Sequence, residues 1–221
     1  MSERKINFVQ GEFYHVYNRG NSKQVIFKDH IDYQRFQMLL YLCNATKKFK
    51  IEYLRKQKQD FYTLERDCLV AIGSYCLMPN HYHILLTPLV DDGVSLFMKK
   101  LGTAYSMYFN NKNVRSGGLF EGKFKAKWAG NDEYLKYLFC YIHLNPLKLI
   151  NADWKKSLVS REDKKFLEEY KYSSFFDCVQ PVKRRELQIL NLDPFPQYFF
   201  KEGVVDQTYE WFSDRKDLLL K

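Results

Sequence analysis

One apolar hairpin near the middle of the chain constrains its fold more than any other feature. Residues 68–78 form an apolar run, Pro79-Asn80 follows as a turn signal, and a second run extends from His81 to Thr87. Because so few residues connect the two runs, we expect them to pair as antiparallel neighbours. Any fold of this chain therefore contains an antiparallel sheet built on this hairpin.

The segments around the hairpin alternate between strand patterns and helix patterns. Strands are predicted over residues 12–19 and 120–128, and helices over residues 29–46, 93–111 and 132–147. The resulting order, β-α-β-β-α-β-α, is that of the ferredoxin-like fold, in which helices pack on a four-stranded antiparallel sheet. We therefore predict an α+β protein of this class.

The same pattern sets the expected domain organisation. Residues 1–150 carry all the predicted strands and helices and are expected to form one domain. The charged segment 48–66 is interpreted as an insertion or a helical extension. Residues 151–221 have mixed charge and a proline-rich stretch at 192–196, and we expect them to form a C-terminal appendage.

The composition favours a nucleic acid as the partner. The formal net charge is +9 and aromatic residues make up 17% of the chain. Lysine and arginine meet phosphates, while exposed rings can stack on unpaired bases. The competing interpretation is that most of the tyrosines and phenylalanines belong to the core.

The five cysteines and the hydropathy pattern indicate a cytoplasmic protein. The cysteines are scattered and odd in number, which argues against a disulfide framework and against a zinc knuckle. No apolar run approaches the ~20 residues that span a bilayer, and the first residues lack a signal-peptide core. A membrane partner is therefore not expected.

Two histidines open the second strand of the hairpin. His81 and His83 are one residue apart, so in a strand both side chains point to the same face and can share one metal ion. Their position just after a turn favours a site that opens to solvent. With an oxygen as a further ligand, Mg or Mn would suit phosphate chemistry. The alternative is that one histidine is an ordinary core residue, as we expect for Tyr82 on the opposite face.

The last predicted helix carries two further candidates. Tyr141 and Asn145 are four residues apart, so one face of a helix presents both. Asn131 can cap the start of this helix, and Pro146 places its end near Asn145. Two imidazoles and an amide oxygen around a divalent cation, beside a tyrosine hydroxyl, could serve phosphodiester chemistry. Alternatively, Tyr141 packs in the core and Asn145 satisfies backbone carbonyls at the helix end.

Alternating lysines mark the strand predicted over residues 120–128. Lys123, Lys125 and Lys127 would lie on one face of it, and together with Arg19 they are candidates for contacts to DNA phosphates. Like charges on one face repel each other slightly, which favours a polyanionic partner. The alternative is an ordinary solvated face of the sheet.

Four stretches of the chain match one family in the correct order. They span roughly residues 8–150 and read FYHVYNRG at 13–20, LMPNHYH at 77–83, LFEGKFK at 119–125 and, within 132–146, DEYL and YIHLNP. In these motifs the chain resembles the REP-associated tyrosine transposases, relatives of the smallest bacterial insertion-sequence transposases in the HUH endonuclease superfamily.

The resemblance implies a ferredoxin-like fold and a set of site residues. His81 and His83 would be metal ligands, Asn145 the third protein ligand and Tyr141 the nucleophile. The implied activity is metal-dependent cleavage and rejoining of single-stranded DNA through a 5′-phosphotyrosine intermediate, next to a hairpin that the protein recognises. Rejoining would need no ATP, because the covalent link retains the energy of the phosphodiester. The expected partners are single-stranded or hairpin DNA and, for a homodimer, a second copy of the chain.

Three other hypotheses stay open at this point. The chain could be a domesticated nickase that processes repeats without mobilising itself, or a non-catalytic ferredoxin-like module that binds DNA or RNA. It could also be a metal hydrolase that uses water. Loss of cleavage with binding retained in a Tyr141→Phe variant separates the transposase and the nickase from the binding module, whereas a hydrolase would survive the substitution.

Overall fold

The computed structural model describes residues 6–155, 159–180, 182–199 and 208–210. Its centre is a four-stranded sheet in the order β2-β3-β1-β4, with every neighbouring pair antiparallel. The strands are β1 (Tyr14–Arg19), β2 (Val70–Met78), β3 (His81–Pro88) and β4 (Lys125–Trp128). This is the strand order of the ferredoxin-like fold, so the predicted α+β class is confirmed.

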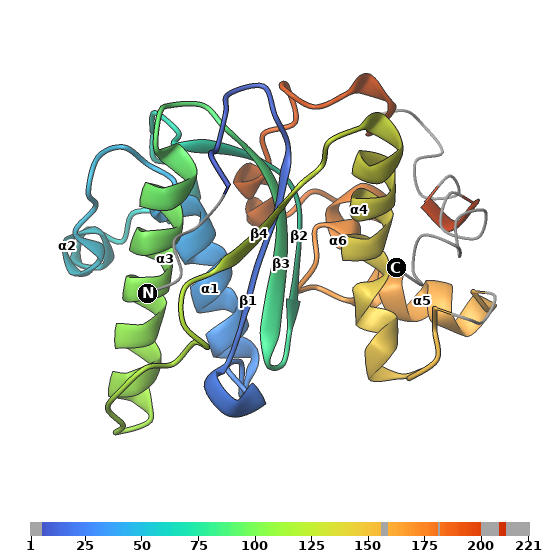
Figure 1. Ribbon diagram of the computed structural model, residues 1–221. Coiled ribbons are helices and arrows are strands. Elements are labelled where there is room, and N and C mark those ends of the chain that lie inside the picture. The colour runs from blue at the N-terminus through green and yellow to red at the C-terminus, as the bar shows by residue number, and fades with distance from the viewer. Residues whose placement is uncertain (1–5, 156–158, 181, 200–207, 211–221) are drawn as a thin grey trace.

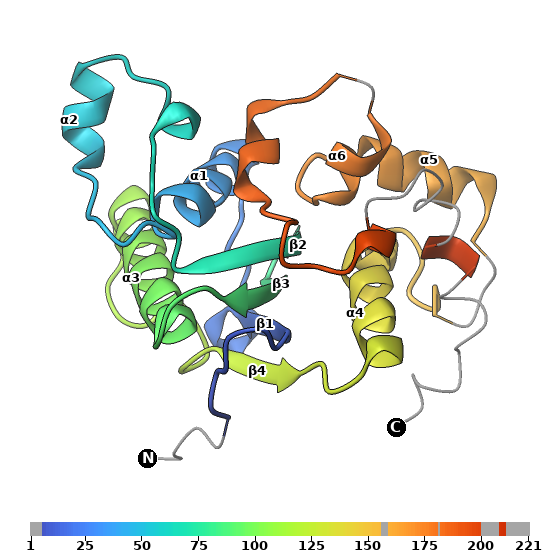
Figure 2. The same ribbon diagram turned by 90° about the horizontal axis from the view of Figure 1, so that it is seen from above.

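Helices cover both faces of the sheet (Figures 1 and 2). Helices α1 and α3 lie on one face, and α4 lies on the other. The helices are α1 (His30–Leu42), α2 (Ile51–Lys56), α3 (Gly93–Lys112), α4 (Asp132–Leu144), α5 (Arg161–Glu169) and α6 (Phe175–Val179). Within the described ranges, no helix is both long enough and apolar enough to cross a membrane.

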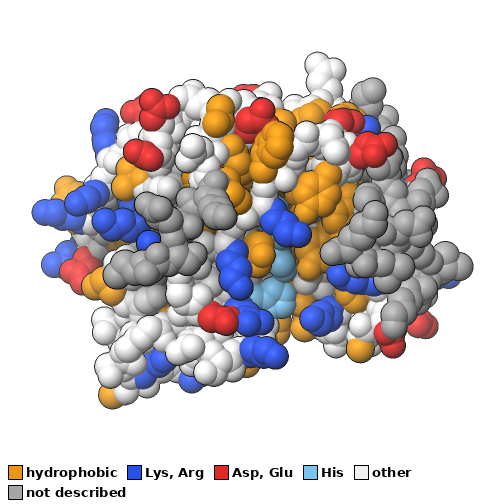
Figure 3. Space-filling view, in the orientation of Figure 1, with side chains coloured by type: hydrophobic (Ala, Val, Ile, Leu, Met, Phe, Trp, Pro, Cys, Tyr) orange, Lys and Arg blue, Asp and Glu red, His pale blue; other side chains and the backbone are white. Residues whose placement is uncertain are grey.

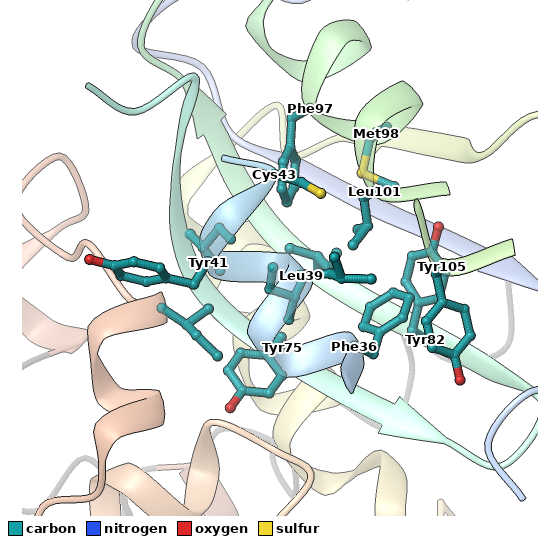
Figure 4. Close-up of a cluster of buried hydrophobic side chains, with 14 of the residues drawn as sticks. Phe36, Leu39, Tyr41, Cys43, Tyr75, Tyr82, Phe97, Met98, Leu101 and Tyr105 are labelled. Atoms are coloured by element: carbon teal, nitrogen blue, oxygen red, sulfur yellow. The ribbon is translucent and has the colours of Figure 1, made fainter. Parts of the chain in front are cut away.

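The alternation of side chains along β1 separates the two faces. Tyr14 and Val16 are buried with Tyr82 of β3 in the core that α1 and α3 cover. In this core Phe36 of α1 and Tyr105 of α3 lie beside Tyr82 (Figure 4), and the Phe36 and Tyr82 ring centroids are 4.9 Å apart. The prediction that Tyr82 is a core residue is confirmed. The intervening residues of β1 face α4, and this second face carries the candidate site.

Helix α4 begins at the residue that the sequence indicates. The Asn131 side chain caps it by accepting a hydrogen bond from the backbone N–H of Tyr134. The α-helical geometry stops at Leu144, three residues before the predicted end, and a 3-10 helix continues over Asn145–Leu149. Pro146 explains the change, because it has no N–H to donate to the preceding turn.

Strand β4 is shorter than the predicted strand over residues 120–128. Gly122 has a φ of +67°, a left-handed conformation that breaks the extended backbone. Before it, Phe120 makes only an isolated bridge with Gly20, and regular pairing with β1 begins at Lys125. The prediction of one strand carrying three lysines on one face is therefore wrong, because Lys123 lies outside β4.

The segment 48–66 is part helix and part loop. It contains α2 and a 3-10 turn at Phe61–Thr63. Tyr62 of this turn is buried and packs on Tyr41 of α1, with ring centroids 5.2 Å apart. The segment therefore packs on α1 through its 3-10 turn.

Part of the described chain beyond residue 150 packs along the outer edge of β2. The backbone N–H of Leu77 donates to Tyr172 O at 2.9 Å, and that of Ser174 donates to Tyr75 O at 3.0 Å. Further along the chain, Phe195 covers Gly73, where a Cβ would come within 2.6 Å of the ring. This segment thus protects an edge strand whose backbone groups would otherwise face solvent.

Candidate active site

Strand register brings the two candidate histidines to one end of the β1–β3 pair. In the antiparallel ladder His81 lies opposite Arg19, and His83 lies opposite Tyr17. On the other side of β1, Lys125 of β4 lies opposite Tyr17. Because side chains of directly paired residues point to the same face, all five lie on the face that α4 covers. The His81 and His83 ring centroids are 5.0 Å apart.

Helix α4 and the 3-10 helix that continues it place the remaining two candidates, Tyr141 and Asn145, beside these histidines. The ring centroids of Tyr141 and His83 are 5.4 Å apart. The side-chain amide of Asn145, one turn further along the chain, interacts with both Tyr141 and His81. The structure therefore brings together all four residues that the sequence singles out. They come from β3, from α4 and from the 3-10 helix that follows α4.

Burial keeps both candidate ligands neutral. Desolvation lowers the pKa of His81 to about 4, and the nearby charge of Lys148 acts in the same direction, against a smaller opposite effect of Asn145. Desolvation also lowers the pKa of His83 well below its ordinary value. Neutral imidazole is the form that binds a metal, so both rings are ready to act as ligands at neutral pH.

Hydrogen bonding fixes which nitrogen of His81 carries the proton. Nδ1 of His81 lies 2.6 Å from Oδ1 of Asn80, whose Nδ2 donates to the carbonyl oxygen of Lys23. An amide oxygen only accepts hydrogen bonds, so Nδ1 is the donor in this pair. The Nε2 atom of His81 therefore carries a lone pair rather than a proton.

Buried polar atoms at the site fit a divalent cation. Nε2 of His83 and Oδ1 of Asn145 are buried and have no hydrogen-bond partner among the described residues. With Nε2 of His81 they make a set of two nitrogens and one amide oxygen, which suits several divalent ions. The described residues contain no group of three His, Cys, Asp or Glu side chains that could hold a metal. Asn145 is the residue that could complete such a set as a third protein ligand.

The phenol of Tyr141 is half-buried and carries a perturbed pKa. Desolvation raises this pKa, and the contact with Asn145 opposes the effect. The Lys155 ammonium lies 4.9 Å from the centroid of the Tyr141 ring, and Trp154 stacks on the ring with centroids 6.2 Å apart. A cation beside the ring favours the phenolate, which is the nucleophilic form.

Two lysines at the site are absent from the sequence-based predictions. Lys148 lies three residues after Asn145 on the 3-10 helix, and its charge reaches both candidate histidines. Lys155 reaches the site after a further turn of the chain. The signal for Lys148 is its spacing of one helical turn from Asn145. Nothing in the local pattern indicates Lys155.

A cavity of about 350 Å³ opens beside His81. Basic side chains surround it, and Figure 3 shows Lys and Arg side chains gathered around the exposed histidine surface. The lining residues are Tyr17, Asn18, Arg19, Lys23, Asn80, His81, Glu121, Lys125 and Lys148. A phosphate group would find several cations within reach at the mouth of the site.

The four predicted phosphate contacts have different surroundings. Lys125 lines the cavity beside His81, and Lys127 lies on the same face opposite His15. Lys123 instead lines a second cavity of about 1130 Å³, next to α3. Arg19 lies at the site, but its Nε and Nη2 atoms both donate hydrogen bonds to the Glu121 carboxylate, with Nη2 2.9 Å from Oε1. This ion pair raises the pKa of Arg19.

Comparison with known proteins gives one matching family model and a similar solved structure. A family model described as "Transposase IS200 like" matches residues 9–145, which is more than half of the chain. The matched segment includes His81, His83, Tyr141 and Asn145. A solved structure of a REP-associated tyrosine transposase bound to a REP hairpin is 16% identical in sequence, covering 84% of this chain and 90% of that one with a TM-score of 0.49. No curated protein matches the chain.

Proposed function

The chain belongs to the family of IS200-like transposases, and from this premise we propose that it cleaves and rejoins single-stranded DNA through Tyr141. One observation carries the proposal. A tyrosine lies beside two neutral histidines and an asparagine whose unpaired atoms suit a divalent cation, and one of these histidines, His81, lines a basic pocket. The family match supports a transposase, and this geometry supports the chemistry.

The nucleophilic step would be carried by the phenol oxygen of Tyr141. It loses its proton and forms a bond to the scissile phosphorus, while the bond from phosphorus to the 3′ oxygen breaks and that oxygen takes up a proton. The products are a 5′-phosphotyrosine and a free 3′-hydroxyl. Attack by a 3′-hydroxyl on the phosphotyrosine reverses the step and joins strands, with Tyr141 leaving.

His81, His83 and Asn145 would hold Mg or Mn, which when bound supplies positive charge to the phosphate oxygens. The protein's own cations complete the electrostatics. Lys148 and Lys125 at the cavity can hold the phosphate backbone, and Lys155 lies where it favours the Tyr141 phenolate. Trp154 stacks on the Tyr141 ring, with centroids 6.2 Å apart.

We propose a DNA hairpin next to the cleavage site as the element that the protein recognises. The net charge of +9 suits a polyanionic partner, and the site offers room for an unpaired strand beside His81. A hairpin would present such a strand at a defined distance from a duplex stem.

Covalent adduct formation tests the proposal. The protein would be incubated with labelled single-stranded hairpin oligonucleotides from the DNA flanking its gene, with Mg or Mn, and run on a denaturing protein gel. A metal-dependent covalent band is expected from the wild type and from Tyr134→Phe, which removes a hydroxyl two turns earlier on α4. The band should be absent from Tyr141→Phe.

The other outcomes identify competing functions. Binding without any band across a fair set of flanking sequences would indicate a non-catalytic binding module. Cleavage that survives Tyr141→Phe and leaves no adduct would indicate a hydrolase that uses water. Either result would overturn the proposed tyrosine chemistry.

A further inference from the structure

A third histidine lies under the site, and the proposed reaction does not use it. His15 of β1 is 5% exposed, and its Nε2 lies 2.8 Å from Nδ1 of His83. The two rings are stacked, with centroids 5.0 Å apart and planes 26° from parallel. His15 is therefore the only described side chain that hydrogen-bonds to the ring of His83.

Neighbouring rings hold His15 in this position. Tyr17 stacks on it at 5.0 Å between centroids, and Tyr141 approaches its edge at 6.1 Å. Desolvation lowers the pKa of His15 to about 3, with a smaller contribution from Lys127. A buried neutral imidazole in this position offers one donor and one acceptor nitrogen.

The hydrogen bond between the two neutral rings has two arrangements with opposite consequences. If Nδ1–H of His83 donates to Nε2 of His15, then Nε2 of His83 keeps a lone pair. If His15 donates instead, Nε2 of His83 carries the proton and cannot bind a metal. This Nε2 atom is buried without a partner among the described residues, so only the first arrangement leaves it ready to be a ligand.

We propose that His15 is a positioning residue that accepts a hydrogen bond from Nδ1–H of His83 and so directs the Nε2 lone pair of His83 toward the metal site. The inference rests on the proposed function, because it assigns His83 as a ligand. The accepted bond also orients the ring and makes Nε2 more basic. On β3, Oδ1 of Asn80 accepts the corresponding hydrogen bond from Nδ1 of His81. Each candidate ligand therefore has its own hydrogen-bond acceptor at Nδ1.

Two variants at position 15 separate an acceptor role from a packing role. His15→Leu fills similar space without an acceptor. His15→Gln places an amide oxygen near the position of the original Nε2 and can accept the bond from His83. The matched control is His143→Gln, which replaces a buried histidine of α4 that hydrogen-bonds to Ser174 rather than to the site.

The binding experiment titrates each full-length protein with Mn²⁺ and follows free Mn²⁺ by electron paramagnetic resonance. Removing such an outer hydrogen-bond partner typically weakens metal affinity by about 10- to 100-fold, so His15→Leu should weaken Mn²⁺ binding by this factor. His15→Gln should recover most of the affinity, and His143→Gln should bind as the wild type does. Equal losses in the Leu and Gln variants, or no loss in either, would overturn the acceptor role.

A second readout needs neither metal nor a variant. Nitrogen-15 NMR of the metal-free wild type distinguishes the two tautomers, and His83 should carry its proton on Nδ1. A proton on Nε2 would overturn the inference even if His15→Leu fails to fold. A wild type that binds no Mn²⁺ at all would overturn the metal site and the inference with it. Wild-type binding that is unchanged in His15→Leu would overturn the inference alone.

Discussion

Ser174 and His143 join the C-terminal segment to the helix that carries the candidate nucleophile. Oγ of Ser174 lies 2.8 Å from Nε2 of His143 on α4, and the same oxygen accepts a hydrogen bond from the backbone N–H of Tyr75 at 2.9 Å. All three groups are buried. One hydroxyl therefore connects α4, the edge strand β2 and the segment beyond residue 150.

Replacing this hydroxyl should destabilise the protein. Ser174→Ala leaves the N–H of Tyr75 and the ring of His143 buried with fewer partners, so we expect a loss of about 1–3 kcal/mol in the free energy of unfolding. Urea denaturation followed by circular dichroism measures it. Ser106→Ala on α3, where no such bond is lost, should change stability by less than about 0.5 kcal/mol. Similar losses in both variants would contradict the role of Ser174.

Mapping the covalent adduct should identify Tyr141 rather than Tyr17. Both tyrosines lie at the site, since Tyr17 lines the cavity and its ring centroid is 5.9 Å from that of His83. Only Tyr141 lies next to Lys155 and contacts Asn145. Tyr141→Phe should lower the rate of cleavage by more than about 10³-fold, and Tyr17→Phe should still form an adduct. Mass spectrometry of the cross-linked peptide decides between them, and a DNA adduct on Tyr17 would reassign the nucleophile.

The positions of the lysines predict unequal effects on DNA binding. Lys125 lines the cavity beside His81, while Lys123 faces a different cavity. Lys125→Gln should weaken binding to a single-stranded oligonucleotide and reduce the slope of log K against log salt by about 0.7, the value for one phosphate contact on a single strand. Lys123→Gln is the matched control and should keep the wild-type slope. Fluorescence anisotropy at several salt concentrations measures both slopes, and equal reductions would extend the binding surface to Lys123.

Local periodicity was sufficient to predict the sheet and the four central candidates. The strand period places His81 and His83 on one face, and the helix period places Tyr141 and Asn145 together. Periodicity does not predict the register in which two strands pair. His15 meets His83 only because β1 pairs antiparallel with β3 at one particular alignment, which long-range packing decides.

Local backbone geometry explains two further differences. Gly122 has a positive φ that interrupts the strand, so Lys123 does not share a strand face with Lys125 and Lys127. An alternating sequence pattern alone does not reveal such a break. Pro146 correctly indicated the end of α4, but the chain continues as a 3-10 helix and carries Lys148 to the site. The pairing of Tyr172 with β2 was not predicted because it depends on a long-range contact at a sheet edge.

Lys155 should affect the chemical step more than DNA binding. Burial raises the pKa of Tyr141, and the Lys155 ammonium lies 4.9 Å from the centroid of the Tyr141 ring, where we expect its positive charge to favour the phenolate. Removing the charge in Lys155→Gln should raise that pKa further, so the rate of adduct formation should fall about 10-fold and its rise with pH should move to higher pH. Lys155→Arg keeps the charge and should retain most of the rate. Single-turnover rates at several pH values test this, and an unshifted pH profile in Lys155→Gln would exclude the effect.

The buried histidines predict that the protein loses stability in mild acid. Desolvation lowers the pKa of His143 to about 3, against about 6.5 for an unfolded chain. Between these values the unfolded state binds a proton that the folded state does not. The stability is therefore fully present above pH ~6.5 and falls as the pH drops toward ~3, by up to about 1.4 kcal/mol per pH unit for this residue.

His143→Gln isolates this contribution. The amide can keep a hydrogen bond to Ser174 but does not titrate, so the fall in unfolding free energy between pH 7 and pH 5 should be shallower than in the wild type. His15 and His83 remain in the variant, and their lowered pKa values should preserve part of the pH dependence. Urea denaturation at the two pH values gives both slopes. Identical slopes would mean that His143 binds protons equally in the folded and unfolded states, contrary to its burial.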